Sequence, residues 1–331
     1  MKKIILLIFA LCLSVSVWAQ KKNNFVIAIH GGAGNIKPKF FTPEKKKQYE
    51  DKMREALDVG YKILENGGTS LEAVRSTINV LEDSPLFNAG KGAVLTSEGV
   101  PSLDASIMDG KTLNAGAVAG VSSVKNPIDA AWQVMENSEH VMLSGKGADE
   151  FSKIRGLETV PAFYFYTPRM QKRWSSIHAK KVKQSNKLKK DSYDKHGTVG
   201  AVALDKHGNL AAGTSTGGMM YKKFGRIGDS PVIGAGTYAN NKTCAVSCTG
   251  HGEYFIRSAV AYDISARMEY LNEGLQTASD QVINNRMGKL GGTGGVVSLD
   301  KDGRVAFSFN TSGMFRGYKS SNGTFQTLLF K

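Results

Sequence analysis

His196-Gly197-Thr198-Val199-Gly200 begins the stretch, ending at Glu253, that decides how this chain is interpreted. Thr198 opens an alternating apolar run through Leu204, which predicts a buried strand. A threonine at the start of a strand is ordinary, because β-branched residues fit strands. Its surroundings are less ordinary, since a long basic segment ends just before it and three clusters of threonine and glycine follow. These clusters indicate a functional site around the start of the strand.

The three clusters are TSTGG at residues 214–218, GRIGDSP at 225–231 and TGHGE at 249–253. They supply hydroxyl groups and glycine amides that a ligand can approach closely. Arg226 can bind a carboxylate through two hydrogen bonds, and Asp229 can hold an ammonium group. Together they predict a site for a zwitterionic amino acid. The alternative is a surface ion pair between Arg226 and Asp229, worth at most about 1 kcal/mol.

A hydroxyl nucleophile in this site lacks a base, because no histidine or lysine stands at an obvious relay position. Thr198 can supply its own if the bond after Gly197 is cut, since the new α-amine then lies beside its hydroxyl. Such an amine has a pKa of about 7.7 to 8.0, so a neutral fraction exists at neutral pH. We therefore expect a threonine nucleophile at a newly made amino terminus.

Three further motifs precede Thr198: IHGGAG at residues 29–34, PLFNAG at 85–90 and LDASIMDG at 103–110. Together with GTVG at 197–200 and the three clusters, they follow the order and separations of one known family. Over about residues 25–315, apart from the linker before Thr198, the chain resembles the plant-type asparaginases, also called isoaspartyl peptidases. Members of that family are N-terminal-nucleophile hydrolases, which cut themselves before a nucleophilic threonine.

The resemblance implies one domain built from two fragments, residues 20–197 and 198–331, that share a four-layer αββα fold. It implies cleavage between Gly197 and Thr198, and then hydrolysis of isoaspartyl dipeptides and of the L-asparagine side-chain amide through an acyl-enzyme on Thr198. It also implies a dimer of cut chains, a small-molecule or dipeptide substrate, and no cofactor for catalysis.

For catalysis, the resemblance assigns the developing oxyanion to the Thr249 hydroxyl and the Gly250 amide. Each such donor is worth about 3 kcal/mol. Thr216 would hydrogen-bond the nucleophile Thr198. The alternative is that Thr216 and Thr249 are ordinary strand residues with satisfied hydroxyls.

For substrate binding, the resemblance places the α-carboxylate on Arg226 and the α-ammonium on Asp229 and the Gly252 carbonyl. Asn88 would reach towards the site, although asparagine in a glycine-rich loop is usually explained by turn chemistry. Phe224, close to Arg226 in the sequence, leaves the shape of the pocket open.

A structural sodium ion is a further implication of the resemblance. Its ligands would be backbone carbonyls, which suit a hard cation: those of Leu81, Glu82, Ser84, Phe87, Ala89 and Lys91. His196 and His251 are an alternative metal pair, but two histidines without a third nearby ligand seldom bind a metal.

Residue patterns predict helices and strands in both halves of the chain. Thr42-Pro43 begins a helix with proline at its first position, and Thr69 with Glu72 forms a capping box for a second helix. Turn residues between apolar runs predict hairpins at 199–214 and 296–309, and one helix is predicted over 253–273. We therefore expect an α+β domain with strands from both halves between helices.

The first 19 residues form a predicted secretory signal peptide, with two lysines, a short apolar run and a small-residue end. The run is short for a membrane span, so we expect an exported, periplasmic protein without a membrane contact; a membrane anchor or buried N-terminal helix is the alternative. Cys244 and Cys248 remain after its removal. On one strand their Cα atoms would be about 13 Å apart, too far for a disulfide.

The formal net charge is +14, and residues 171–195 contribute half of it with nine basic and two acidic residues. Periodicity disappears over 161–195, which predicts a flexible basic linker. The alternative is a binding module for anionic polymers. Since no aromatic stacking pattern accompanies the charge, we expect no nucleic-acid partner.

A glycosylasparaginase is the nearest enzyme alternative, because such enzymes share the architecture. They typically carry an acidic residue before the nucleophile, where this chain has Gly197, and a shorter acidic version of TGHGE. Both differences favour the isoaspartyl peptidase interpretation.

Overall fold

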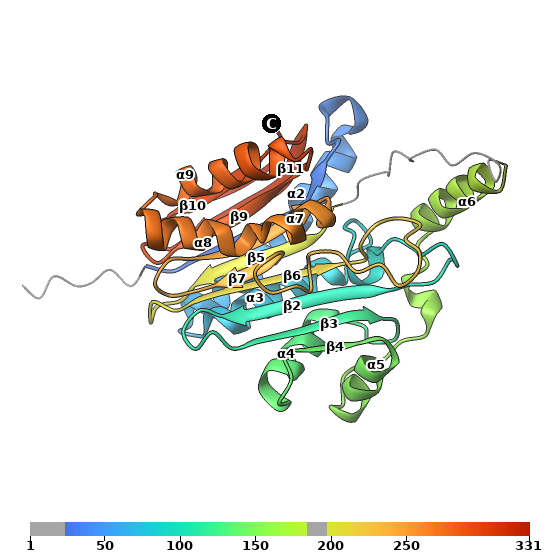
Figure 1. Cartoon of the computed structure of the whole chain (residues 1–331), viewed down its shortest axis with the longest axis horizontal. Coiled ribbons are helices and arrows are strands. Elements are labelled where there is room, and N and C mark those ends of the chain that lie inside the picture. The colour runs from blue at the N-terminus through green and yellow to red at the C-terminus, as the bar shows by residue number, and fades with distance from the viewer. Residues whose placement is uncertain (1–23, 184–196) are drawn as a thin grey trace, which may run out of the picture.

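The computed structural model describes residues 24–183 and 197–331, whose strands form two sheets (Figure 1). The larger sheet has the order β12-β11-β1-β5-β6-β2-β3-β4, antiparallel throughout except between β3 and β4. In that order the strands span Phe325–Phe330, Gly313–Ser320, Val26–Gly34, Val199–Leu204, Leu210–Thr216, Leu103–Asp109, Ala115–Val121 and Met142–Ser144.

The smaller sheet has the order β10-β9-β8-β7 and is antiparallel. Its strands span Val305–Phe309, Gly294–Asp300, Cys244–Gly250 and Thr237–Ala239. It packs against the larger sheet, since β8 and β9 contact β1 and β5. Alternate residues of β1 face opposite ways: Val26 and Ala28 join the core between the sheets, whereas Ile27 and Ile29 face the helices.

Helices lie against both sheets (Figure 1). The larger sheet is contacted by α2 (Pro43–Glu65), α3 (Ser70–Glu82), α4 (Pro127–Asn137) and α5 (Gly145–Ile154). The smaller sheet is contacted by α7 (Gly252–Ser258), α8 (Val260–Leu271) and α9 (Leu275–Asp280). The predicted α+β class is confirmed.

Capping residues fix the starts of the first two α-helices as predicted. The Thr42 hydroxyl accepts a hydrogen bond from the Lys45 amide at 3.2 Å, and Pro43 is the first helical residue. Thr69 and Glu72 form the capping box at the start of α3, with hydrogen bonds of 3.2 and 2.8 Å. Both predicted hairpins are also present, as β5–β6 and β9–β10.

Three features of the C-terminal half were not predicted from the sequence. The helix predicted over 253–273 is divided at Ala259, which adopts a left-handed conformation with φ 45° between α7 and α8. After α9, residues Gln281–Met287 form a π-helix. The strands β11 and β12 were not predicted, because Gly313, Arg316 and Gly317 interrupt the apolar pattern of β11.

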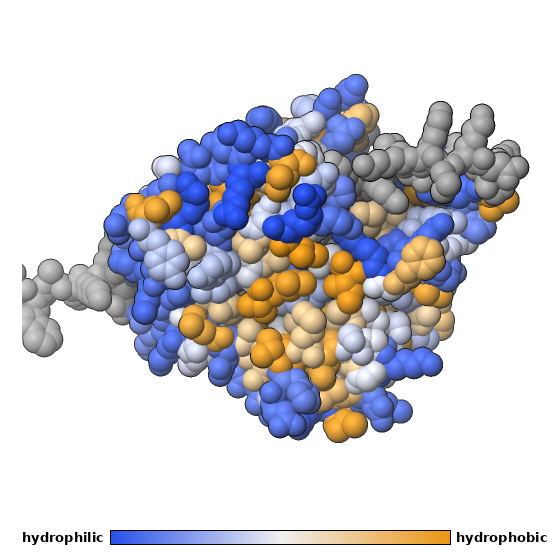
Figure 2. Space-filling model, viewed as in Figure 1, coloured by the Kyte–Doolittle hydropathy of each residue, from blue (hydrophilic) through white to orange (hydrophobic). Residues whose placement is uncertain are grey.

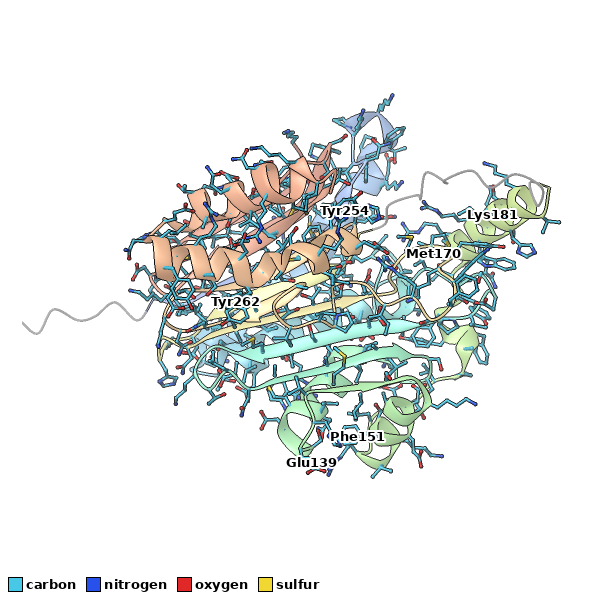
Figure 3. All side chains as sticks on the ribbon, in the orientation of Figure 1. Glu139, Phe151, Met170, Lys181, Tyr254 and Tyr262 are labelled. Atoms are coloured by element: carbon cyan, nitrogen blue, oxygen red, sulfur yellow. The ribbon has the colours of Figure 1, made fainter. Side chains whose placement is uncertain are left out.

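The predicted flexible linker contains regular structure in its described part. A short 3-10 helix spans Ala162–Phe165, and α6 spans Pro168–Lys183. Met170 is buried, and the Trp174 ring nitrogen donates to the Thr96 carbonyl at 2.8 Å. These two residues lie one turn apart, so an apolar stripe holds a helix that is otherwise charged. Met170 lies near the end of α6 closest to the sheets and Lys181 near its outer end (Figure 3).

The predicted signal peptide, residues 184–195 of the predicted linker, and His196 lie outside the described residues. Within the described ranges, no helix has the length and apolar composition needed to cross a membrane. Cys244 and Cys248 are buried in β8 and unpaired, which confirms that they form no disulfide.

Candidate active site

Thr198 is buried at the start of β5, beside the end of β6, because Val199 pairs with Ser215 across the two strands. Its Oγ1 donates a hydrogen bond to Thr216 Oγ1, 3.1 Å away. Thr216 Oγ1 also accepts one from the Gly218 amide at 2.9 Å. The structure therefore brings these two threonines together, and Thr216 orients the Thr198 oxygen.

Thr249 reaches the same point from the smaller sheet, where it stands near the end of β8. Its Oγ1 accepts hydrogen bonds from the Thr198 nitrogen at 3.2 Å and the Ala33 nitrogen at 3.3 Å. Both acceptor positions of the Thr249 hydroxyl are then used, so its proton remains available for donation to a third group. Gly250 follows with φ 153°, and a Cβ there would lie 2.5 Å from the Thr293 carbonyl oxygen, so only glycine fits.

Gly197 is in main-chain contact with Gly32, which lies in β1 at the register shift after His30. A Cβ added to either glycine would lie 2.3 Å from the Cα of the other. Gly32 also has φ 112°, a conformation that favours glycine. A side chain at either position would require the main chain beside Thr198 to move.

His30 holds the main chain of Thr198 from β1, a role that sequence reasoning missed. Its Nδ1 lies 3.0 Å from the Thr198 carbonyl oxygen and its Nε2 lies 2.9 Å from Ser247 Oγ. Burial lowers the pKa of the imidazole to about 3, against the opposing effect of the hydrogen bond to Thr198. The ring is therefore neutral, with Nδ1–H donating to the carbonyl and Nε2 accepting from Ser247. Its sequence signals were its place in the IHGGAG motif and a polar side chain inside a buried strand.

Arg226 pairs with Glu253 and not with Asp229. Its Nε and Nη2 donate to the two Glu253 oxygens, each at 3.0 Å, and His251 Nε2 lies 3.3 Å from Oε2 of the same carboxylate. Burial acts to raise the pKa of Glu253, but the hydrogen bonds and charge of Arg226 outweigh it and lower the pKa. Glu253, which was not predicted as a site residue, thus fixes the guanidinium and leaves Nη1 outside the pair.

Asp229 is buried next to Arg226 and Gly252. A Cβ on Gly252 would lie 2.9 Å from Asp229 Oδ1 and 2.8 Å from Arg226 Nη2, so the glycine keeps this space free. Burial raises the pKa of the Asp229 carboxyl to about 7, although Arg226 acts to lower it. Its Oδ2 is buried without a hydrogen-bond partner. An unsatisfied buried acceptor is costly, and an ammonium group could satisfy this one.

Asn88 connects the loop after α3 to the end of β6. Its Nδ2 donates to the Gly218 carbonyl at 2.8 Å, its Oδ1 accepts from the Val94 amide at 2.9 Å, and its carbonyl accepts from the Gly217 amide at 3.1 Å. Asn88 therefore positions the two residues that follow Thr216.

A buried lysine, also missed from the sequence, lies behind this turn. Lys222 Nζ donates to the Ser102 carbonyl at 2.7 Å and lies 3.7 Å from Asp104 Oδ2. Burial lowers the pKa of Lys222 and raises that of Asp104, while each charge opposes the shift of the other. A Cβ on Gly218 would lie 2.9 Å from Lys222 Nζ, so the ammonium is close to the site.

The predicted sodium loop is compact around two glycines. A Cβ on Gly90 would lie 2.4 Å from the Glu82 carbonyl oxygen, and one on Gly92 would lie 2.0 Å from that of Phe87. The carbonyls of Leu81 and Ala89 accept hydrogen bonds from Ser84 and Gly92 at 3.3 and 3.1 Å. The described residues contain no metal-binding group of three or more His, Cys, Asp or Glu. Carbonyl donors fit the chemistry of a hard cation.

A cavity of about 300 Å³ adjoins Gly197 and Asn88. Its lining includes residues 31–34, Tyr49 and Phe315. The cavity therefore opens beside the main chain that carries Thr198.

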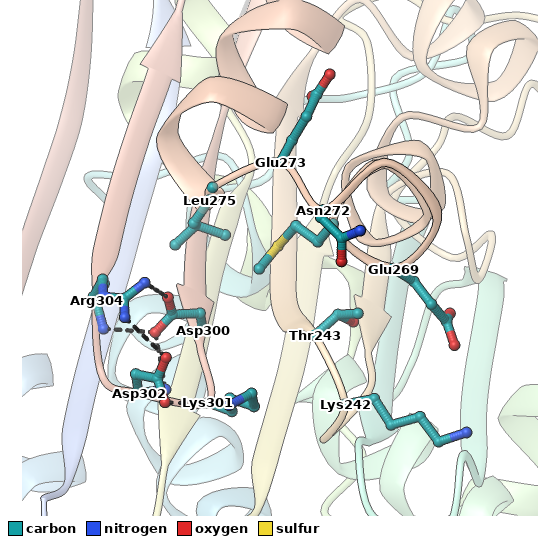
Figure 4. Close-up of a pocket in the computed structure, with 12 residues that line it drawn as sticks. Lys242, Thr243, Glu269, Asn272, Glu273, Leu275, Asp300, Lys301, Asp302 and Arg304 are labelled. Atoms are coloured by element: carbon teal, nitrogen blue, oxygen red, sulfur yellow. Dashed lines mark hydrogen bonds and ion pairs between the residues drawn. The ribbon is translucent and has the colours of Figure 1, made fainter.

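A larger cavity, of about 490 Å³, lies near the turn between β9 and β10 (Figure 4). Thr243 lines it, six residues before Thr249 and so about 20 Å away along β8. Among its charged residues, Arg304 pairs with Asp300 and with Asp302. It contains none of the predicted site residues and we assign it no role.

Comparison with known proteins gives extensive matches. The family model described as asparaginase matches residues 23–329. The isoaspartyl peptidase of Salmonella typhimurium is 46% identical over 311 residues, covering 93% of this chain and 99% of that protein. The isoaspartyl peptidase of Escherichia coli is 46% identical over 311 residues, covering 92% and 96%. The plant-type L-asparaginase of Pyrococcus horikoshii is 42% identical over 303 residues, covering 88% and 95%.

Proposed function

The chain belongs to the asparaginase family, and from this we propose that it hydrolyses isoaspartyl dipeptides and the side-chain amide of L-asparagine. The observation that carries the proposal is that Thr198 is hydrogen-bonded to both Thr216 and Thr249, next to Arg226 and Asp229. The activities named for the similar proteins support it.

The first reaction is a cut between Gly197 and Thr198. The Thr198 oxygen attacks the Gly197 carbonyl carbon, the bond from that carbon to the Thr198 nitrogen breaks, and water hydrolyses the resulting ester. The glycine contact between Gly197 and Gly32 supports this step, because the main chain there is free of Cβ atoms. His30 supports it by holding the Thr198 carbonyl.

In the cut enzyme, the Thr198 amine accepts the hydroxyl proton as the oxygen attacks the side-chain carbonyl of the substrate. Thr249 Oγ1 already accepts from the Thr198 nitrogen, so its free proton can serve the developing oxyanion together with the Gly250 amide. The leaving amine takes up the proton, and water then hydrolyses the acyl-enzyme. Thr216 keeps the nucleophile oriented.

The α-amino acid head of the substrate binds on the other side of Thr216. Arg226 binds the α-carboxylate through Nη1, the nitrogen outside its pair with Glu253. Asp229 Oδ2 and the Gly252 carbonyl bind the α-ammonium. The missing hydrogen-bond partner of Asp229 Oδ2 supports this assignment.

The rest of the proposed enzyme follows from the same family. The two fragments, 20–197 and 198–331, share a four-layer αββα fold, for which the packing between sheets and helices is the support. The loop carbonyls from Leu81 to Lys91 hold a structural sodium ion, and catalysis needs no cofactor.

Export and self-association complete the proposal. The signal peptide directs the protein to the periplasm, and cut chains form dimers. Figure 2 shows hydrophobic residues gathered on one face near β2, β3 and β7, and large exposed patches often mark interfaces. The mass measured by light scattering tests the dimer, and a monomer at micromolar concentration contradicts it.

Glycosylasparaginase activity is the competing function. Rates with β-Asp-Leu and with GlcNAc-asparagine separate the two, and release from the sugar conjugate alone would overturn our assignment. The basic binding module is tested by salt-sensitive retention on heparin, which we expect to be weak.

The central experiment determines the fragments and the nucleophile. Mass spectrometry under denaturing conditions should show two fragments, and Edman degradation should give a sequence that starts Thr-Val-Gly-Ala. Thr198→Ala should remain uncut and inactive, whereas Thr198→Ser should keep part of both activities because it retains a hydroxyl. Hydrolysis by a folded Thr198→Ala protein would end the proposal.

A further inference from the structure

The proposed chemistry assigns no role to the 300 Å³ cavity beside Gly197. Ala33 lines it, and the Ala33 amide donates to Thr249 Oγ1 at 3.3 Å. The cavity therefore begins one hydrogen bond away from the proposed oxyanion donor. Arg226 and Asp229 do not line it. A substrate whose amino acid head is held by those two residues can extend its other end into this space.

One wall of the cavity is aromatic. Tyr49 stacks on Phe315 with ring centroids 4.5 Å apart and planes 4° apart. Phe41 packs edge-on against both, at 5.8 and 6.0 Å. All three line the cavity, so it offers a rigid apolar surface to a ligand side chain.

The charged residues of the cavity are all basic. Lys45, Arg169 and Arg173 line it, and none of the described lining residues is acidic. Arg169 donates hydrogen bonds to three uncharged oxygens, the Tyr49 hydroxyl and the carbonyls of Pro85 and Leu86. Lys45 Nζ lies 4.9 Å from the Phe41 ring centroid, next to the aromatic wall. The cavity thus combines an apolar wall with a positive potential.

We propose that this cavity binds the leaving residue of an isoaspartyl dipeptide, with an apolar side chain on the aromatic wall and the free carboxylate near Lys45 and Arg169. The inference rests on the proposed function. As the isopeptide C–N bond breaks, the acyl carbon stays on Thr198 Oγ1 and the leaving amine takes the proton that the Thr198 amine had accepted. A volume of 300 Å³ is at the small end of ligand sites, which suits one residue better than a longer peptide.

The test compares substrates that differ only in the leaving residue. The kcat/KM for β-Asp-Phe should exceed that for its C-terminal amide by about two- to fivefold at low salt, and added salt should reduce the ratio. Lys45→Glu should bring the ratio to one or below. Lys47→Glu, which lies on the same helix but outside the cavity, should leave the ratio as in the wild type. Because each ratio is measured within one variant, a loss of folded protein cancels.

A second comparison tests the aromatic wall. The enzyme should prefer β-Asp-Phe to β-Asp-Gly by about tenfold, and Phe41→Ala should reduce that preference several-fold. Equal kcat/KM for β-Asp-Phe and its amide, with no effect of Lys45→Glu on their ratio and no preference for β-Asp-Phe over β-Asp-Gly, would overturn this inference but not the proposed function. Failure to hydrolyse any isoaspartyl dipeptide or L-asparagine would instead overturn the proposed function.

Discussion

Lowering the pH should weaken substrate capture, because the Asp229 carboxyl becomes protonated. Burial raises its pKa to about 7. About nine-tenths of the molecules then carry the carboxylate at pH 8 and about one-tenth at pH 6. A neutral carboxyl cannot form an ion pair with the substrate ammonium. Since kcat/KM reports the ionisation of the free enzyme, it should fall about tenfold through this group alone.

The Thr198 amine adds a second ionisation on the same side of the profile. It must be neutral to accept a proton, and unperturbed α-amines have pKa values of about 7.7 to 8.0. The plot of log kcat/KM against pH should therefore rise with a limiting slope of about 2 on its acid side. Asp229→Asn removes one ionisation, so its slope should be about 1 and its KM should be higher.

Initial rates with β-Asp-Leu at constant ionic strength measure this profile. Asp51→Asn, at an exposed position of α2, is the control and should keep the wild-type slope. A slope of about 1 in the wild type, together with an unchanged KM in Asp229→Asn, would refute the role of this carboxylate.

Asp229→Asn should also be more stable than the wild type at alkaline pH. The folded-state pKa of about 7 lies above the usual value for aspartate, so the folded state binds the proton more tightly and stability falls as pH rises from about 4 to about 7. At pH 8 the buried carboxylate costs at most about 4 kcal/mol. Asp229→Asn avoids that cost, so its Tm at pH 8 should rise while kcat/KM falls.

Three other substitutions test the site. Gly32→Ala should slow the cut before Thr198, because its Cβ would lie 2.3 Å from the Gly197 Cα and its φ of 112° would add about 1–3 kcal/mol of strain. Denaturing gels measure the fraction of cut chain. Gly147→Ala is the control, since a Cβ there meets nothing within 4 Å. Glu253→Gln should raise KM by about tenfold because Arg226 loses a charged partner, whereas Glu273→Gln, in the similar pair with Arg267, should leave KM unchanged. Trp174→Ala should lower the free energy of unfolding by about 2 kcal/mol in urea and raise KM, because α6 packs against Tyr221, which begins the segment that leads to Arg226. Trp132→Ala in α4 should lower the free energy of unfolding but leave KM unchanged.

Features set by neighbouring residues could be predicted from the sequence. The caps at Thr42 and Thr69 and the two hairpin turns involve residues within a few positions of each other. The motifs also pointed to Thr216 and Thr249, which the structure brings to Thr198.

Partners far apart in the chain could not be predicted in this way. His30 contacts Thr198 across 168 positions, because β1 and β5 are neighbours in the sheet. Arg226 pairs with Glu253, 27 positions away, and not with the buried Asp229 nearby in the sequence. The many charged residues of α6 made it look like a linker, although a few apolar side chains pack the helix against the rest of the protein.

The strand order of the larger sheet has a consequence for a chain cut at Gly197. Within the described sheet, β1 of the first fragment lies between β11 and β5 of the second, and β6 of the second pairs with β2 of the first. Dilution cannot separate the two fragments unless the hydrogen bonds between these strands break. Once fully denatured, however, the mature protein can reassemble only when two polypeptides collide, so its recovery would depend on concentration, whereas the uncut precursor could recover alone. Maturation would thus make thermal damage harder to repair.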